Sequence, residues 1–171
     1  MIAILLFLSG SQLFAQQVIF SENFENKVLD SSWQPVNGNW HIADVSELKI
    51  APAEHGFRYA LCADSTGYIR CFLDIPGSIK ASQVKFSFSY YTYAQGSGGS
   101  VEFEFHKKNW KDGIRGKVLK ASLPVKGKWT DYQKTLKIPP EANSIWIIFY
   151  KAPGGNFKKL CFDNLMITAL K

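Results

Sequence analysis

The sequence predicts an all-β protein, an antiparallel β-sandwich with about ten strands. Short segments alternate between apolar and polar residues with the period of a strand, whereas patterns with the period of a helix are nearly absent. Pairs of Gly, Pro, Asn and Asp interrupt these segments at short intervals. Many short strands separated by such turns are typical of a sandwich or jelly roll.

The first segment, residues 1–16, is predicted to be a secretory signal peptide. An apolar run, Met-Ile-Ala-Ile-Leu-Leu-Phe-Leu, is followed by small and polar residues that end in Ala15-Gln16. The run is shorter than the roughly 20 residues that span a bilayer. It lacks the usual initial Lys or Arg, and a buried N-terminal strand is the alternative. We therefore expect an exported protein, secreted, periplasmic or on the cell surface. Residues 17–171 would form a single domain with no transmembrane segment.

Three segments carry the clearest strand signals. Residues 82–93 and 101–106 alternate, so that one face is apolar, and residues 144–150 are apolar on both faces, as expected of a central strand. The predicted core positions are Val84, Phe86, Phe88, Val101, Phe103, Phe105, Ile145, Ile147 and Phe149, and Tyr90 points to the same side as the first three. Further strands are predicted at residues 17–24, 39–43, 47–51, 57–63, 68–74, 117–123, 128–137 and 160–168.

The net charge of +6 is compatible with an anionic partner or simply with solubility. Lys greatly outnumbers Arg, which occurs only at Arg58, Arg70 and Arg115. Because Arg is the preferred side chain for contacts with bases and phosphates, this composition argues against nucleic acid as a partner.

Three cysteines, Cys62, Cys71 and Cys161, leave at least one thiol unpaired. Cys62 and Cys71 flank a predicted hairpin turn at residues 64–67, which would place them diagonally and unfavourably for a disulfide. All three could instead be small buried side chains. The disulfide state therefore stays open at the level of sequence.

Motifs at both ends of residues 17–171 resemble a known family. The start contains Asn23-Phe24-Glu25, followed by Trp33 and Gly38-Asn-Trp-His-Ile42, and the end reads Leu160-Cys-Phe-Asp-Asn-Leu-Met-Ile167. These motifs resemble galactose-binding-like jelly rolls, including carbohydrate-binding modules that recognise xylan, cellulose and β-glucan. Adhesin and MAM-type sandwiches are similar as well. The Gly usual in the first motif is missing here.

The resemblance implies a non-catalytic module that binds a polysaccharide or other glycan, with its first and last strands side by side. It also implies a structural calcium ion near Glu25 and Asp163, with Glu22 or Asn164 as less secure ligands. Carboxylates are suitable calcium ligands. The alternative is that Glu25 and Asp163 cap turns or pair with Lys.

The polar face opposite the predicted core is the candidate ligand site. If the three clear strands lie in one sheet, that face carries Lys85, Tyr91, Tyr93, Glu102, Glu104, Trp146 and Tyr150. Aromatic rings can cover the apolar face of a sugar ring, and charged side chains can bind its hydroxyls. The alternative is that these rings serve packing. A second candidate is a pair of basic loops, residues 107–115 around Trp110 and residues 151–159 around Phe157.

Enzymatic activity stays uncertain from the sequence. Glu102 and Glu104 lie two residues apart on one strand face, as the carboxylates of jelly-roll glycosidases do, but His106 stands where a further acid is expected. A metal site formed by these three side chains is a weaker alternative. An adhesion or structural module that binds a cell-surface protein is the remaining hypothesis.

Overall fold

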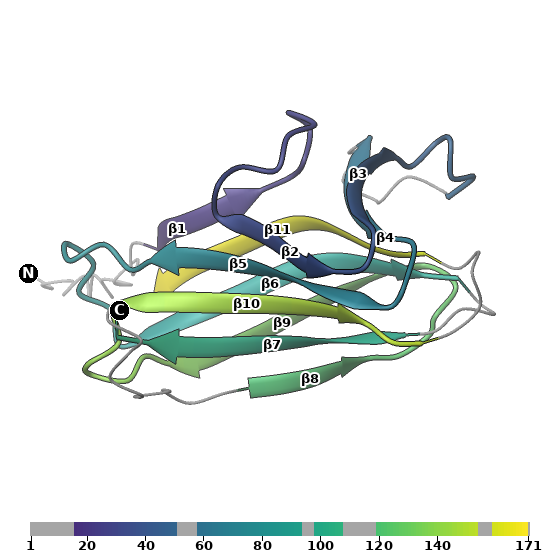
Figure 1. Cartoon of the computed structure of the whole chain (residues 1–171). Coiled ribbons are helices and arrows are strands. Elements are labelled where there is room, and N and C mark those ends of the chain that lie inside the picture. Colours follow the sequence, from purple (N-terminus) through teal and green to yellow (C-terminus); the bar gives the residue numbers. More distant parts are fainter. Residues whose placement is uncertain (1–15, 51–57, 94–97, 108–118, 154–158, 171) are drawn as a thin grey trace, which may run out of the picture.

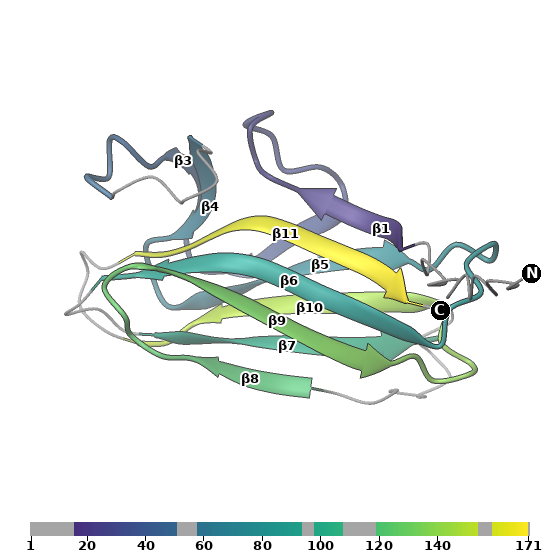
Figure 2. The same cartoon turned by 180° about the vertical axis from the view of Figure 1, so that it is seen from behind.

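The computed structural model describes residues 16–50, 58–93, 98–107, 119–153 and 159–170. These residues form eleven strands, β1 to β11, and no helix. The strands make two antiparallel sheets that pack face to face, as the two opposite views in Figures 1 and 2 show. The predicted all-β sandwich is therefore confirmed.

Each sheet draws strands from several parts of the chain. The five-stranded sheet has the order β2 (Trp33–Asn37), β5 (Gly67–Asp74), β10 (Ser144–Lys151), β7 (Gly99–His106) and β8 (Leu119–Leu123). The six-stranded sheet has the order β3 (Trp40–Asp44), β4 (Tyr59–Ala63), β11 (Leu160–Leu170), β6 (Gln83–Thr92) and β9 (Trp129–Lys137), with β1 (Gln17–Glu22) also paired to β11.

The core lies between the two sheets, where the inward side chains of both meet. Phe149 of β10 is fully buried and its ring centroid lies 4.0 Å from that of Phe162 of β11, so the two sheets contact each other through aromatic rings. All nine predicted core positions are at most 2% exposed, and Tyr90 is 3% exposed. Strand alternation read from the sequence thus predicted the inward face of the three clearest strands.

The first and last strands lie side by side, as the resemblance implied. β1 pairs with residues Leu165 to Ala169 of β11, whereas β4 pairs with residues Leu160 to Phe162. Between these two stretches Asn164 adopts a left-handed conformation (φ 52°), and the pairing of β11 with β6 shifts at the same place. One long strand, β11, therefore pairs with β4 along its first part and with β1 along its last part.

Three details of the predicted strands are wrong. Residues 45–49 form turns rather than the strand predicted at 47–51, and β2 was not predicted. β2 contains Pro35, which lowers the strand signal but is tolerated at the edge position that β2 occupies. β4 and β5 do not form the predicted hairpin, because they belong to opposite sheets.

The crossing from β4 to β5 changes which cysteines are close. Cys62 of β4 lies directly opposite Cys161 of β11, and the two form a disulfide bond. Cys71 points into the core from β5 and is free and buried. The bond joins strands whose cysteines are 99 residues apart in the sequence.

The predicted signal peptide lies almost entirely outside the described residues, which begin at residue 16. Within the described ranges, no helix is long and apolar enough to cross a membrane.

Candidate functional site

The outer face of the five-stranded sheet carries a group of outward aromatic and charged side chains. Ile145, Ile147 and Phe149 of β10 point into the core and are fully buried. Since side chains alternate along a strand, Trp146 and Tyr150 point away from the core, and both are partly exposed. On β7 the same alternation turns Glu102 and Glu104 to this outer face.

The seven predicted ligand residues do not share one face. β6 lies in the six-stranded sheet, whereas β7 and β10 lie in the five-stranded sheet. Lys85, Tyr91 and Tyr93 are therefore on the opposite side of the sandwich from the other four. The prediction that all seven share one sheet face is wrong. Strand alternation shows which side chains of a strand point the same way, but it does not show which strands lie next to each other. Whether these residues bind a ligand stays a prediction.

Two aromatic side chains that the sequence interpretation missed complete the face. In the pairing of β5 with β10, Phe72 lies opposite Trp146 and Tyr68 lies opposite Tyr150. The Phe72 and Trp146 rings meet edge to face, with centroids 4.7 Å apart. At about 3.3 Å per residue, the two cross-strand pairs are roughly 13 Å apart along β10. The alternation of β5 was visible in the sequence, but its position beside β10 was not.

Charged side chains lie between and beside these aromatic pairs. Arg70 stands on β5 opposite Ile148, and Glu102 stands opposite Ile148 on the other side of β10. Lys120 of β8 forms an ion pair of 2.6 Å with Glu102. This hydrogen bond raises the pKa of Lys120 above its usual value. Glu102 is therefore held by a cation on its own face.

Glu104 is held differently, by the imidazole of His106. One Glu104 oxygen lies 2.7 Å from His106 Nε2, and both side chains are buried. The His106 ring stacks on Trp146, with centroids 4.0 Å apart and planes inclined by 24°. The carboxylates proposed for glycan cleavage thus each have a basic partner. Within the residues described, no group of three or more His, Cys, Asp and Glu is arranged to hold a metal ion.

A hollow of about 440 Å³ opens at the Trp146 end of this face. It combines aromatic carbon with hydroxyl and carboxylate oxygens, which is the combination that suits a sugar ring. Its lining residues are Ser32, Phe72, Leu73, Asp74, Ser144 and Trp146.

On the outer face of the six-stranded sheet, the predicted aromatic residues serve packing. Tyr91 contacts Tyr93 and Trp129 at centroid distances of 5.3 Å and 5.7 Å. The Tyr93 hydroxyl donates a hydrogen bond to the Leu48 carbonyl, 3.1 Å away. These rings pack against a small buried cluster that includes the Cys62–Cys161 disulfide and holds the 45–50 segment on the sheet. Lys85 lies further along this face, at a polar hollow of about 260 Å³.

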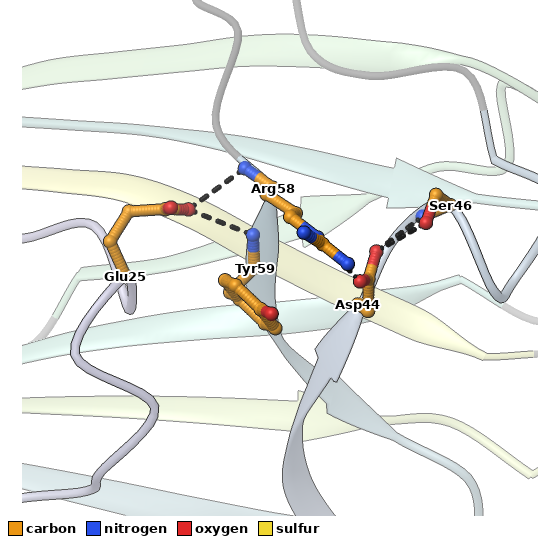
Figure 3. Close-up of polar contacts among 5 residues, drawn as sticks. All are labelled: Glu25, Asp44, Ser46, Arg58 and Tyr59. Atoms are coloured by element: carbon orange, nitrogen blue, oxygen red, sulfur yellow. Dashed lines mark hydrogen bonds and ion pairs between the residues drawn. The ribbon is translucent and has the colours of Figure 1, made fainter.

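The two predicted calcium ligands lie in different surroundings. One oxygen of Glu25 accepts hydrogen bonds from the backbone N–H groups of Arg58 and Tyr59, both at 2.8 Å (Figure 3). Asp163 is 1% exposed, and its Oδ1 accepts a hydrogen bond from the Asn164 N–H. Burial, reinforced by the charges of Glu25 and Glu22, raises the pKa of Asp163 to about 7.

The Glu25 contact continues into an ion pair at the end of the β3–β4 pair. Arg58 Nε lies 2.6 Å from Asp44, whose other oxygen accepts hydrogen bonds from the hydroxyl and N–H of Ser46 (Figure 3). The Ser46 hydrogen bonds and Arg58 lower the pKa of Asp44. Glu25 thus ties the segment after β1 to the start of β4.

Comparisons with known proteins agree with this geometry at the level of the fold. No family model matches the chain, and no curated relative matches it. Among solved structures, the CBM22-2 xylan-binding domain of Paenibacillus barcinonensis Xyn10C has a TM-score of 0.60 and 13% identity, covering 88% of this chain and 99% of that domain. The K1 adhesin domain of Lys-gingipain from Porphyromonas gingivalis has a TM-score of 0.60 and 15% identity, and the match covers 92% of this chain and 99% of that domain. This chain has the fold of galactose-binding-like jelly-roll modules.

A larger protein contains the same fold. The enzymatically active domain of tailspike protein 4 from bacteriophage CBA120 has a TM-score of 0.67 and 12% identity. The match covers 87% of this chain but only 20% of the tailspike chain, so the two proteins share one jelly-roll unit. The resemblance read from the terminal motifs is confirmed.

The second candidate site from the sequence cannot be placed. Trp110 and Phe157, the aromatic centres of the two basic loops, lie outside the described residues.

Proposed function

We propose that this protein is an exported, non-catalytic module that binds polysaccharide along the outer face of its five-stranded sheet. The observation that carries the proposal is the arrangement of two cross-strand aromatic pairs, Phe72 with Trp146 and Tyr68 with Tyr150, on one exposed face. Sugar rings could lie on these pairs, because aromatic carbon covers the apolar faces of pyranoses. The hollow beside Trp146 supports the proposal, and so does a fold shared with a xylan-binding domain.

The polar side chains of the face would bind sugar hydroxyls. Glu102, partly exposed and paired with Lys120, keeps oxygen atoms that can accept hydrogen bonds. Lys120 offers further donors. Glu104 is buried beneath the edge of this face and would act by holding His106 under Trp146. The Cys62–Cys161 disulfide supports export, because disulfides persist in oxidising compartments.

The test is affinity electrophoresis of residues 17–171 through gels that contain neutral and acidic polysaccharides. Trp146→Ala should lose retention while keeping the circular dichroism spectrum of the wild type. Trp129→Ala is the matched control, since it removes an indole from the other sheet and should leave retention unchanged.

Three outcomes would redirect the proposal. Loss of retention only in Trp129→Ala would move the site to the six-stranded sheet and its Tyr91 cluster. Absence of retention on every gel would reject glycan binding and favour an adhesion module that binds protein. New reducing ends that disappear in Glu102→Gln would show a glycan-cleaving enzyme instead.

We also propose that Glu25 and Asp163 hold a structural calcium ion. A buried aspartate that is repelled by Glu25 and Glu22 is a suitable place for a cation, which would offset that repulsion. The second oxygen of Glu25, which has no hydrogen-bond partner among the described residues, would be the one that binds the ion. Calcium should raise the melting temperature of the wild type and leave Asp163→Asn unchanged. An equal shift in both proteins would argue against this site.

A further inference from the structure

Arg70 occupies the centre of the proposed binding face. It lies on β5 between Tyr68 and Phe72, and opposite Ile148 on β10. Because side chains two residues apart on a strand share a face, its guanidinium is flanked by the two aromatic pairs. A glycan that covered both pairs would therefore pass over Arg70.

Unlike Glu102 and Lys120, which pair with each other, Arg70 has no oppositely charged partner among the described residues. Its polar contact is with Tyr68, whose hydroxyl is 3.4 Å from Nη2 and whose ring centroid is 5.2 Å from the guanidinium carbon. Glu102, the nearest acid in the same row, is already paired with Lys120. Among the described residues, therefore, no acidic side chain neutralises the positive charge of Arg70.

The Nε atom of Arg70 is buried and has no hydrogen-bond partner in the described part of the chain, so the terminal nitrogens are the donors that Arg70 offers to a ligand. A buried donor without a partner is costly, and most such groups in proteins are satisfied. A guanidinium presents paired N–H donors in a planar fork that matches carboxylate oxygens and other oxyanions.

We propose that Arg70 binds an anionic group, carboxylate or sulfate, on the polysaccharide, and that the ligand is therefore an acidic glycan. The inference rests on the proposed function of this face. The two terminal nitrogens would donate to two oxyanion oxygens, while sugar rings on either side contact the aromatic pairs. The net charge of +6 would favour the approach of such a chain.

Matched polymers test this inference without any substitution. Polygalacturonate and its carboxyl-reduced form test carboxylate, and dextran sulfate and dextran test sulfate. We expect the wild type to be retained by an anionic polymer roughly tenfold or more better than by its uncharged counterpart, because a charge-assisted contact is lost. A preference for the charged polymer in only one of the two polymer pairs would identify the anionic group as carboxylate or sulfate.

Variants separate a specific contact from general attraction to a polyanion. Arg70→Gln should lose the preference, and Arg70→Lys should keep part of it, since the charge remains but the fork does not. Lys137→Gln is the control, because it removes one positive charge from an exposed position in the other sheet. If Arg70→Gln does not fold, Arg70→Lys and the two polymer pairs still show whether Arg70 binds an anionic group.

The outcomes distinguish failure of the role of Arg70 from failure of glycan binding itself. Equal retention of charged and uncharged polymers would overturn the role of Arg70 and leave glycan binding intact. Equal losses in Arg70→Gln and Lys137→Gln would also overturn it, since they would indicate non-specific attraction. No retention on any neutral or acidic polymer would reject the proposed function itself and this inference with it.

Discussion

The pairing of Cys62 with Cys161 can be tested directly by counting thiols. The structure joins these two residues and leaves Cys71 free and buried. Alkylation of the unfolded, unreduced protein should therefore modify one cysteine, Cys71, and alkylation after reduction should modify all three. Peptide mapping by mass spectrometry identifies which residue carries the label. A label on Cys161 in the unreduced protein would refute the strand register on which the pairing depends.

The disulfide should contribute a large part of the stability. It closes a loop between residues 99 apart in the sequence, for which chain entropy predicts about 4–5 kcal/mol. Measured values for native disulfides are usually about 2–5 kcal/mol, so we expect reduction to lower the free energy of unfolding within that range. Urea titrations with and without reductant measure the difference.

Two variants show whether the loss belongs to this bond. The double variant Cys62→Ala, Cys161→Ala should unfold at the same urea concentration with or without reductant. Cys71→Ala should keep the sensitivity to reductant of the wild type, because it removes a core side chain and no cross-link. Sensitivity that persists in the double variant would contradict the reasoning.

Three further changes test the fold and the buried carboxylate. Phe149→Ala should lower the free energy of unfolding by about 3–5 kcal/mol in urea titrations, because a fully buried ring between the sheets is lost; a loss below 1 kcal/mol would contradict this packing. Gly67→Ala should lower the melting temperature, since a Cβ there would clash with the Asn37 carbonyl oxygen, and an unchanged melt would refute that contact. Burial raises the pKa of Asp163 from 3.8 to about 7, so the folded state loses this proton as the pH rises through that value. In a calcium chelator, the free energy of unfolding should therefore fall by roughly 2–3 kcal/mol between pH 5 and pH 8. Asp163→Asn should abolish that part of the pH dependence, and an unaltered slope would assign it to other groups.

Local patterns were sufficient for much of the fold. Phe86, Phe103 and Ile147 were placed inward by alternation alone, and each is fully buried. This works because a side-chain period of two residues is a property of the single strand. The same reasoning missed β2, whose Pro35 weakens the strand pattern at an edge where no ladder hydrogen bond is required of it.

Only part of the candidate site could be predicted from the sequence. Trp146 and Tyr150 were placed on an outer face from the sequence, and the structure has them there. Phe72 and Arg70 were not included, because their strand was assigned to a hairpin with β4. Tyr91 and Tyr93 were included wrongly on the same face as Trp146, and they pack beneath the 45–50 segment instead.

The sequence by itself determined the class of the protein: its composition of short alternating strands, its turns, the inward face of each clear strand and the resemblance carried by its two terminal motifs. Tertiary structure alone decided which strands are neighbours, and with them the disulfide and the make-up of the proposed binding face. The reason is that strand pairing joins residues far apart in the chain, as Cys62 and Cys161 show. Neither the local period nor the turn residues specify such partners, whereas the packing of two sheets around one core does.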